Sequence, residues 1–252
     1  MKNIKGLLFD IGGVLYVGEK VIPGAEDAIS VLQKKYPMRF LTNTTRKTPL
    51  AMVEKLNHLG FSVKMEELFT ALDATKVYIT SQNGSVYTVL TDESDTWFND
   101  LKSEKPDFVV IGDAYLNFNY TRLNEAFKHL QKGAELIAAA KNRYFKEVDG
   151  TLSMDAGGFI VALEFAAGVE AKLIGKPSRD FFHLAVASMG LKPEEVLMIG
   201  DDIVSDIQGA QDAGLKAALV RTGKFQTSDL EMGITPDIVI EDVTALYSYL
   251  LV

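Results

Sequence analysis

The sequence KGLLFDIGGVL, residues 5–15, decides the fold class of this chain. Its apolar run GLLF is short and is followed at once by the charged Asp10, which is typical of a buried strand that opens onto a loop. The stretch therefore predicts a buried strand with a carboxylate at its carboxyl end.

Helix-like and strand-like patterns alternate after this strand. A helix is expected over residues 23–35, a strand over 38–42, and a helix over 48–59 that Gly60 ends. The last third of the chain repeats the alternation, with strands expected at 173–175, 196–200, 216–220 and 238–240 and helices at 179–189, 204–213 and 243–251. Such alternation favours parallel βαβ units, so we expect an α/β fold with a doubly wound parallel sheet.

The middle of the chain has a different character. Strands are expected at 85–90, 108–111 and 136–139, a helix at 120–132, and a turn-rich stretch at 149–158. A self-contained unit of roughly 90 residues is a plausible size for an inserted domain. We therefore expect residues 1–77 and 173–252 to form a catalytic core and residues 78–172 an inserted α/β domain that closes over a cleft and selects the substrate.

The composition limits the classes of function. The 252 residues carry a formal net charge of −8, which repels nucleic-acid phosphates, so no nucleic-acid partner is expected. The same charge means that a site for a phosphorylated small molecule needs local cations or a metal. The absence of cysteine excludes disulfides, thiol catalysis and zinc–thiolate sites. No stretch approaches the roughly 18–20 apolar residues of a membrane span, so we expect no membrane partner and a cytoplasmic location.

Four polar segments each follow a predicted strand. They are residues 10–15 (DIGGVL), 41–43 (LTN), 175–178 (GKPS) and 199–206 (IGDDIVSD). Ligands bind at the carboxyl ends of the strands in open parallel sheets. Each segment alone also has a structural interpretation, as a turn, a helix cap or a solvated lysine. Their common position after strands favours a shared site.

The residue types in these segments suit phosphoryl transfer. The Asp10 carboxylate can attack phosphorus and form an aspartyl-phosphate. Asp10 and Asp201 offer hard oxygen ligands, which suit Mg²⁺ better than a softer metal. Lys176 can neutralise phosphoryl charge, and Thr42 with Asn43 can donate hydrogen bonds to phosphoryl oxygens.

The four segments resemble the four motifs of the haloacid dehalogenase superfamily, and the resemblance covers essentially the whole chain. The insert resembles the larger α/β cap of that superfamily. Residues 141–147, 154–158, 198–204 and 220–225 resemble one branch, which contains phospholysine phosphohistidine inorganic pyrophosphate phosphatase and its close hydrolase relatives. Caps of this type often pair, so a homo-oligomer is a further expectation.

The resemblance implies a role for each site residue. It makes Asp10 the nucleophile and a Mg²⁺ ligand, with the Gly12 carbonyl and Asp201 as further ligands. Asp202 or Asp206 would hold waters of the metal, and Thr42, Asn43 and Lys176 would bind the transferring phosphoryl group. Asp155 is either a contact from the cap to the substrate or a turn residue.

One position departs from the superfamily pattern. Most of its phosphatases carry a general acid/base Asp where this chain has Gly12, and the branch it resembles also lacks that Asp. Leaving groups that depart readily depend least on a proton donor. The implied substrates are therefore pyrophosphate, a phosphoramidate or a small phosphomonoester. Two alternatives stay open: a general nitrophenyl-phosphate, sugar or nucleotide phosphatase, and a weakly active or non-catalytic binder of phosphate ligands.

Overall fold

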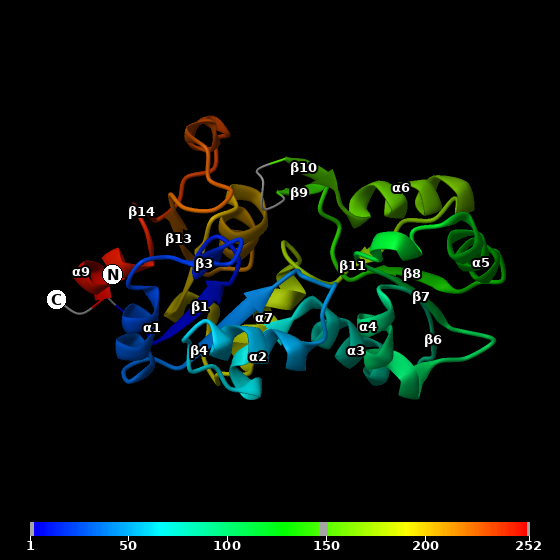
Figure 1. Ribbon diagram of the computed structural model, residues 1–252, viewed down its shortest axis with the longest axis horizontal. Coiled ribbons are helices and arrows are strands. Elements are labelled where there is room, and N and C mark those ends of the chain that lie inside the picture. Colours follow the sequence, from blue (N-terminus) through cyan, green and yellow to red (C-terminus); the bar gives the residue numbers. More distant parts are fainter. Residues whose placement is uncertain (1–2, 147–150, 251–252) are drawn as a thin grey trace. The chain divides into compact units, whose positions relative to one another are not determined.

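The computed structural model describes residues 3–146 and 151–250, which form two compact units (Figure 1). The first unit contains Met1–Thr42, Val53–Phe69 and Lys176–Val252, and the second contains Asn43–Met52 and Thr70–Gly175. The domain boundaries expected near residues 77 and 173 stay a prediction. The expectations for Glu147, for the turn at 149–150 and for residue 251 concern positions outside the described residues.

The first unit is built on a six-stranded sheet in the order β14-β13-β12-β1-β4-β5. Its strands are β1 (Gly6–Asp10), β4 (Met38–Thr42), β5 (Leu68–Thr70), β12 (Val196–Gly200), β13 (Lys216–Val220) and β14 (Ile238–Ile240). The chain starts in the centre at β1, winds outward through β4 and β5, and returns to β12 on the other side of β1. The expected doubly wound parallel sheet is confirmed, and its direction of winding changes between β1 and β12.

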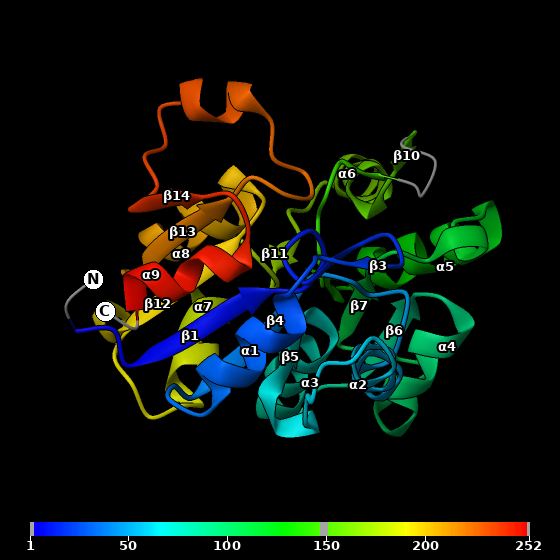
Figure 2. The ribbon, with the colours of Figure 1, turned by 60° about the vertical axis from the view of Figure 1, so that its left-hand side comes forward.

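Complete burial explains why the central strands read as apolar runs. Every residue of β1 and of β12 is buried, as expected for a parallel sheet covered on both faces. Helices lie on both faces (Figure 2). They are α1 (Ala25–Gln33), α7 (Arg179–Ala187), α8 (Gly209–Asp212) and α9 (Leu246–Leu250). Helix α2 (Pro49–His58) begins among the residues of the second unit and ends among those of the first. The amphipathic spacing predicted for α1 is confirmed, because its buried side chains are those of Ala25, Ala28, Ile29 and Leu32.

Several short elements complete the chain. The hairpin β2 (Tyr16–Val17) and β3 (Lys20–Val21) follows β1 directly. The short helical turns are η1 (Met65–Glu67), η2 (Thr96–Leu101), η3 (Tyr115–Asn117), η4 (Pro193–Glu195), η6 (Thr227–Glu231) and η7 (Val243–Ala245). The helix expected at 204–213 begins as a π-helical stretch, η5 (Ile203–Gln208), and continues as α8.

The second unit has a parallel sheet of its own, in the order β11-β8-β7-β6. Its elements are α3 (Ala71–Ser81), β6 (Val86–Val89), α4 (Asp92–Asp95), β7 (Phe108–Ile111), α5 (Tyr120–Gln131), β8 (Glu135–Ala138), β9 (Tyr144–Lys146), β10 (Leu152–Met154), α6 (Ala156–Ala167) and β11 (Lys172–Leu173). Helices α5 and α6 pack together, and Val109, Leu136, Ala126 and Ile160 belong to one buried cluster between sheet and helices. An α/β unit in the middle of the chain is therefore confirmed.

Two sequence expectations in this region are wrong. The stretch 149–158 was expected to be turns, but Ala156–Gly158 begin helix α6, with the Asp155 side chain accepting from the Ala156 N–H at 2.6 Å. The strand expected at 173–175 was assigned to the core sheet, but Leu173 pairs with Ala138 of β8 in the second sheet. A short apolar run does not reveal which of two parallel sheets it joins.

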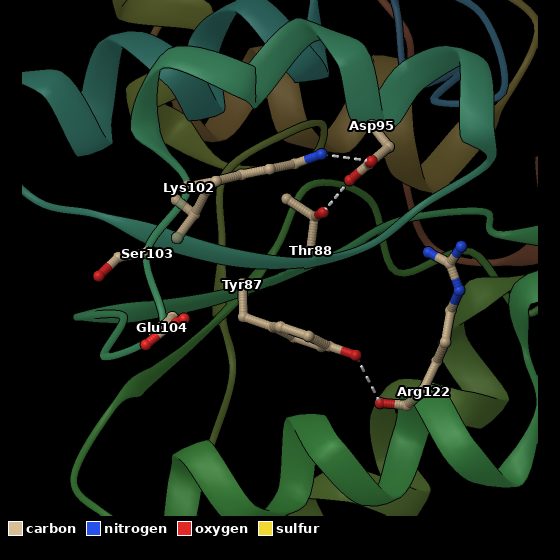
Figure 3. A pocket seen from close by; sticks show the side chains of 8 residues that line it. Tyr87, Thr88, Asp95, Lys102, Ser103, Glu104 and Arg122 are labelled. Atoms are coloured by element: carbon tan, nitrogen blue, oxygen red, sulfur yellow. Dashed lines mark hydrogen bonds and ion pairs between the residues drawn. The ribbon is translucent and has the colours of Figure 1, made fainter.

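A cavity of about 410 Å³ opens on the second unit beside β6 (Figure 3). Its polar lining groups are bonded to one another: Thr88 and Lys102 both donate to Asp95, and the Tyr87 hydroxyl donates to the Arg122 carbonyl. None of the predicted site residues lines this cavity.

Among the helices of residues 3–146 and 151–250, none is both long enough and apolar enough to cross a lipid bilayer.

Candidate active site

The carboxyl ends of three neighbouring strands carry the predicted polar residues of the first unit. Asp10 is the last residue of β1, Thr42 is the last residue of β4, and Asp201 follows β12 directly. The strand register fixes their heights, because Asp10 pairs with Leu41 while Phe9 pairs with Ile199. Backbone pairing therefore brings these three positions to one edge of the sheet.

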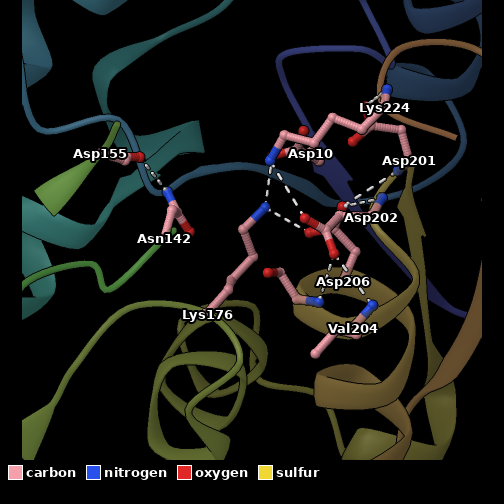
Figure 4. Close-up of polar contacts among 10 residues, drawn as sticks. Asp10, Asn142, Asp155, Lys176, Asp201, Asp202, Val204, Asp206 and Lys224 are labelled. Atoms are coloured by element: carbon pink, nitrogen blue, oxygen red, sulfur yellow. Dashed lines mark hydrogen bonds and ion pairs between the residues drawn. The ribbon is translucent and has the colours of Figure 1, made fainter. Parts of the chain in front are cut away.

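Lys176 links two of the carboxylates at this edge (Figure 4). Its Nζ lies 2.5 Å from Asp10 Oδ1 and 2.6 Å from Asp206 Oδ1, and the lysine side chain is 4% exposed. Burial lowers the pKa of Lys176, but the two carboxylates outweigh burial and raise the pKa above the usual lysine range. Lys176 is therefore a permanent cation in contact with the proposed nucleophile.

Asp10, Asp201 and Asp206 form a cluster in which one potential ligand atom from each lies within 4.8 Å of the others. Burial raises the pKa of Asp201 well above its usual range, and the Asp10 and Asp206 carboxylates raise it further. Three carboxylates beside one lysine leave an excess of negative charge in a dry environment. A cluster of hard oxygen donors with excess negative charge fits a small divalent cation such as Mg²⁺.

Asp206 is held more tightly than the other carboxylates. Its Oδ2 accepts the backbone N–H groups of Asp201 and Asp202, both at 3.2 Å, while its Oδ1 accepts from Lys176. A side chain on Gly200 would collide with it, because a Cβ there would lie 2.2 Å from Asp206 Cβ. Burial raises the pKa of Asp206 to about 6, although Lys176 opposes the rise. The structure thus gives Asp206 the contacts of a residue that positions Lys176 and the Asp201 turn.

Asp202 caps the π-helical stretch. Its Oδ1 accepts from the Val204 N–H at 3.1 Å and the Ser205 N–H at 2.9 Å, and its Oδ2 lies 3.3 Å from Lys224 Nζ. Burial raises the pKa of Asp202, but Lys224 and the backbone donors outweigh it and hold the pKa below its usual value. Both oxygens therefore serve local structure.

Gly12 sits in an open position. A Cβ built on Gly12 meets no atom within 4 Å, the residue is exposed, and its φ lies outside the left-handed region. Its backbone forms a bridge with Tyr16 at the start of the β2 hairpin. The absence of a side chain at this position is therefore not imposed by crowding or by backbone conformation.

Two predicted residues belong to the second unit. Asn43 lies beside Gly175, because a Cβ on Gly175 would be 2.6 Å from Asn43 Oδ1. Asp155 is the N-cap of α6, with its Oδ1 accepting from the Ala156 N–H and its Oδ2 accepting from Asn142 Nδ2 at 3.1 Å (Figure 4). Asp155 therefore has the contacts of a helix cap, the structural interpretation that its sequence also allowed.

Three further residues surround the cluster, and none of them was predicted to be a site residue. The Lys224 N–H donates to Asp201 Oδ2 at 2.7 Å, and the Thr222 hydroxyl donates to the Gly13 carbonyl at 2.5 Å. Burial, and then the Asp10 carboxylate, raise the pKa of Tyr16 to about 12, so its phenol stays protonated. The available signal was position, since residues 221–224 follow β13 at the same edge of the sheet.

Such a sheet edge, with a buried lysine in contact with an aspartate of a carboxylate cluster, is that of a hydrolase that acts on phosphoryl groups. A family model described as haloacid dehalogenase-like hydrolase matches residues 7–103, and a second, described as HAD-hydrolase-like, matches residues 173–246. The chain belongs to the haloacid dehalogenase-like hydrolases and is a phosphatase of that superfamily. The membership expected from the four motifs is confirmed.

Similar proteins cover nearly the whole chain. Haloacid dehalogenase-like hydrolase domain-containing protein 2 of Bos taurus is 38% identical over 229 residues, which cover 90% of this chain and 88% of that protein. Phospholysine phosphohistidine inorganic pyrophosphate phosphatase of Homo sapiens is 37% identical, covering 91% of this chain and 87% of that protein. The solved structure of a 4-nitrophenylphosphatase from Thermotoga maritima has a TM-score of 0.90 at 26% identity, covering 98% of this chain and 97% of its own.

Proposed function

We propose that this chain is a Mg²⁺-dependent phosphatase that works through an aspartyl-phosphate on Asp10. A carboxylate oxygen of Asp10 forms a bond to phosphorus, and the bond from phosphorus to the leaving group breaks with its electron pair on the leaving group. The leaving group takes a proton from solvent. Water then attacks the same phosphorus, which releases inorganic phosphate and restores the Asp10 carboxylate.

The contact of Asp10 with Lys176 is the observation that carries this proposal. A carboxylate that attacks a phosphoryl dianion must overcome charge repulsion, so a fixed cation is needed at the point of attack. Lys176 Nζ lies 2.5 Å from Asp10 Oδ1 and stays charged. In the proposal Lys176 neutralises phosphoryl oxygens, and the polar groups of Thr42 and Asn43 donate hydrogen bonds to them.

The carboxylate cluster supports a role for Mg²⁺. Asp10, Asp201 and the Gly12 carbonyl would hold the ion, while Asp206 keeps Lys176 and the Asp201 turn in place. When bound, Mg²⁺ would offset the negative charge of the carboxylates and of the phosphoryl oxygens. The carbonyl of Gly12 requires no side chain, so the departure from the superfamily pattern leaves this ligand intact.

The open position of Gly12 supports a substrate class with good leaving groups. No carboxyl group stands at this position to protonate an alkoxide, so alkyl phosphates should react slowly. Pyrophosphate releases phosphate, and a phosphoramidate releases a nitrogen that is readily protonated. The relative named phospholysine phosphohistidine inorganic pyrophosphate phosphatase, 37% identical, favours the same substrates.

A second candidate function is a general phosphatase of nitrophenyl phosphate and of sugar or nucleotide phosphates. It is favoured by the similarity to the 4-nitrophenylphosphatase structure. Nitrophenolate is also a good leaving group, so Gly12 does not separate the two candidates. A non-catalytic binder of phosphate ligands is the third outcome of the test below.

The test is a rate measurement on four substrates with Mg²⁺ present: pyrophosphate, phospholysine, nitrophenyl phosphate and an alkyl phosphate. The proposal expects turnover of the first two at the highest kcat/KM and loss of all turnover in Asp10→Asn. Glu231→Gln, which alters an exposed carboxyl group of the same unit, serves as the matched control and should retain activity. Binding of phosphate without turnover of any substrate would establish the binder, and a preference for nitrophenyl phosphate with sugar phosphates would establish the general phosphatase.

A further inference from the structure

The Asp201 carboxylate is enclosed by the backbones of two separate turns. Gly13 has a φ of +88°, and a Cβ built on it would lie 1.9 Å from Asp201 Oδ2. Gly223 has a φ of +66°, and a Cβ built on it would lie 2.0 Å from the same oxygen. Only glycine leaves room for the carboxylate at this approach, and only glycine adopts these backbone angles readily. The Asp201 side chain is therefore held in a slot formed by two glycines.

Hydrogen bonds close the slot. The Lys224 N–H donates to Asp201 Oδ2 at 2.7 Å, and the Thr222 hydroxyl donates to the Gly13 carbonyl at 2.5 Å. The three residues Thr222, Gly223 and Lys224, here called the bracing loop, thus contact both the turn after β1 and the carboxylate after β12. That turn contains Gly12, whose carbonyl is a proposed ligand.

Fixed orientation of a ligand matters for metal affinity. A carboxylate that is free to rotate must be immobilised when an ion binds, and partners that orient the ligands of a site typically change affinity by about 10–100-fold. The Lys224 N–H holds Asp201 Oδ2 in place, which fixes the orientation of the whole carboxylate and so the position of its Oδ1. The loop also fixes the spacing between that oxygen and the Gly12 turn.

We propose that the bracing loop is a positioning element for divalent-cation binding, and that Gly223 and Gly13 are required for cation affinity because they admit the Asp201 carboxylate. The inference rests on the proposed Mg²⁺ site. It goes beyond that site by assigning a role to residues that neither bind the ion nor contact the phosphoryl group.

The first test compares two glycine substitutions by titrating the protein with Mg²⁺ in a calorimeter, without substrate. Gly223→Ala introduces a methyl group into the slot. Gly233→Ala is the matched control, because Gly233 also has a positive φ, +76°, lies in the same connection between β13 and β14, and has no atom within 4 Å of its Cβ position. We expect the Kd for Mg²⁺ to rise about tenfold or more in Gly223→Ala and less than about twofold in Gly233→Ala.

A gentler pair of variants covers the case in which Gly223→Ala fails to fold, since its methyl group would also lie 2.5 Å from Gly13 Cα. Thr222→Val keeps the side-chain shape and removes the hydroxyl that binds the Gly13 carbonyl, whereas Thr222→Ser keeps that hydroxyl. We expect weaker Mg²⁺ binding in Thr222→Val and near-normal binding in Thr222→Ser. The rise of the unfolding temperature with Mg²⁺ concentration gives a second readout of the same affinities.

The outcomes separate this inference from the proposed function. The positioning role alone would be overturned if wild-type protein binds Mg²⁺ and the folded Gly223→Ala and Thr222→Val variants bind it equally well. Wild-type protein that binds no Mg²⁺ at millimolar concentration would overturn the proposed metal site and the inference with it. Equal losses in Gly223→Ala and Gly233→Ala would assign the effect to backbone strain and would also overturn the inference.

Discussion

Replacement of Lys176 by methionine tests the electrostatics of the site in the absence of metal and substrate. Methionine fills a similar volume, so the substitution removes the charge with little change in packing. It leaves Asp10 and Asp206 buried without the ammonium group that lies 2.5 and 2.6 Å from them. Removing one partner of a buried ion pair typically costs about 3–5 kcal/mol. We expect that loss in the free energy of unfolding at pH 8, measured in EDTA.

The dependence on pH has a definite sign. Burial already raises the pKa of Asp206 to about 6 with Lys176 present, and Lys176 opposes that rise. Without the lysine the pKa rises further above the unfolded value, so the folded state binds more protons than the unfolded state over a wider range of pH. Where the folded state binds more protons than the unfolded state, the free energy of unfolding decreases as the pH rises. Lowering the pH from 8 to 5 should therefore increase the stability of Lys176→Met more than that of wild type.

Lys216→Met provides the matched control. Lys216 also pairs with a carboxylate, Asp237, at 2.8 Å, but its side chain is 55% exposed. Exposed pairs contribute about 1 kcal/mol or less, so this variant should unfold close to wild type and should show no additional pH dependence. Urea unfolding followed by far-ultraviolet circular dichroism measures both variants. A loss in Lys176→Met no larger than in Lys216→Met, or one that does not shrink at pH 5, would refute the account of the buried carboxylates.

Three further predictions concern single residues. Asp201→Asn should raise the Mg²⁺ concentration needed for half-maximal rate, because a hard-cation site loses one of few charged ligands, and an unchanged Mg²⁺ titration would remove Asp201 from the metal site. Gly12→Asp places a carboxyl group in open space, where it can act as a general acid. The value of kcat/KM should rise by up to about 10²–10⁴-fold for an alkyl phosphate and by less for nitrophenyl phosphate. Equal changes for the two substrates would show that the missing acid does not set selectivity. Asp155→Ala should lower the free energy of unfolding by about 1 kcal/mol, whereas Asp155→Asn should retain the helix cap. Thermal unfolding measures both variants, and equal stability of the two would contradict the cap role.

The core sheet was predictable because its central strands carry strong local signals. β1 and β12 are fully buried, so they read as continuous apolar runs bounded by polar residues. The carboxyl ends of parallel strands meet at one edge, and this general property was enough to predict that Asp10, Thr42 and Asp201 lie near one another.

Helix α6 was missed for a physical reason. Its sequence AGGFIVALEFAA is apolar on nearly every face and carries two glycines in its first turn, so it shows neither amphipathic periodicity nor good helix propensity at its start. Gly157 allows helix α6 to approach the backbone of Asn142, because a Cβ on Gly157 would lie 2.5 Å from the Asn142 carbonyl oxygen. Close approach of two backbone segments leaves no periodic trace in the sequence.

The bracing loop was missed for a related reason. It acts on the site through a backbone N–H, a hydroxyl and the absence of a side chain at Gly223, and none of these identifies a ligand-positioning role in a sequence. Asp206 shows the converse case. Its residue type indicated a place at the metal site, where its role in holding waters of the metal stays a prediction, but not the contacts in which its oxygens accept from Lys176 and from two backbone N–H groups.

The most direct test of the central claim is the identification of the phosphorylated residue. Wild-type protein with Mg²⁺ is mixed briefly with radiolabelled pyrophosphate, quenched in acid, digested and analysed by mass spectrometry and by radioactivity. The account predicts an acid-stable acyl phosphate on the peptide that contains Asp10, at a level that rises and decays within a single turnover, and none in Asp10→Asn. Full turnover by Asp10→Asn, or wild-type turnover with label on a residue other than Asp10, would contradict it.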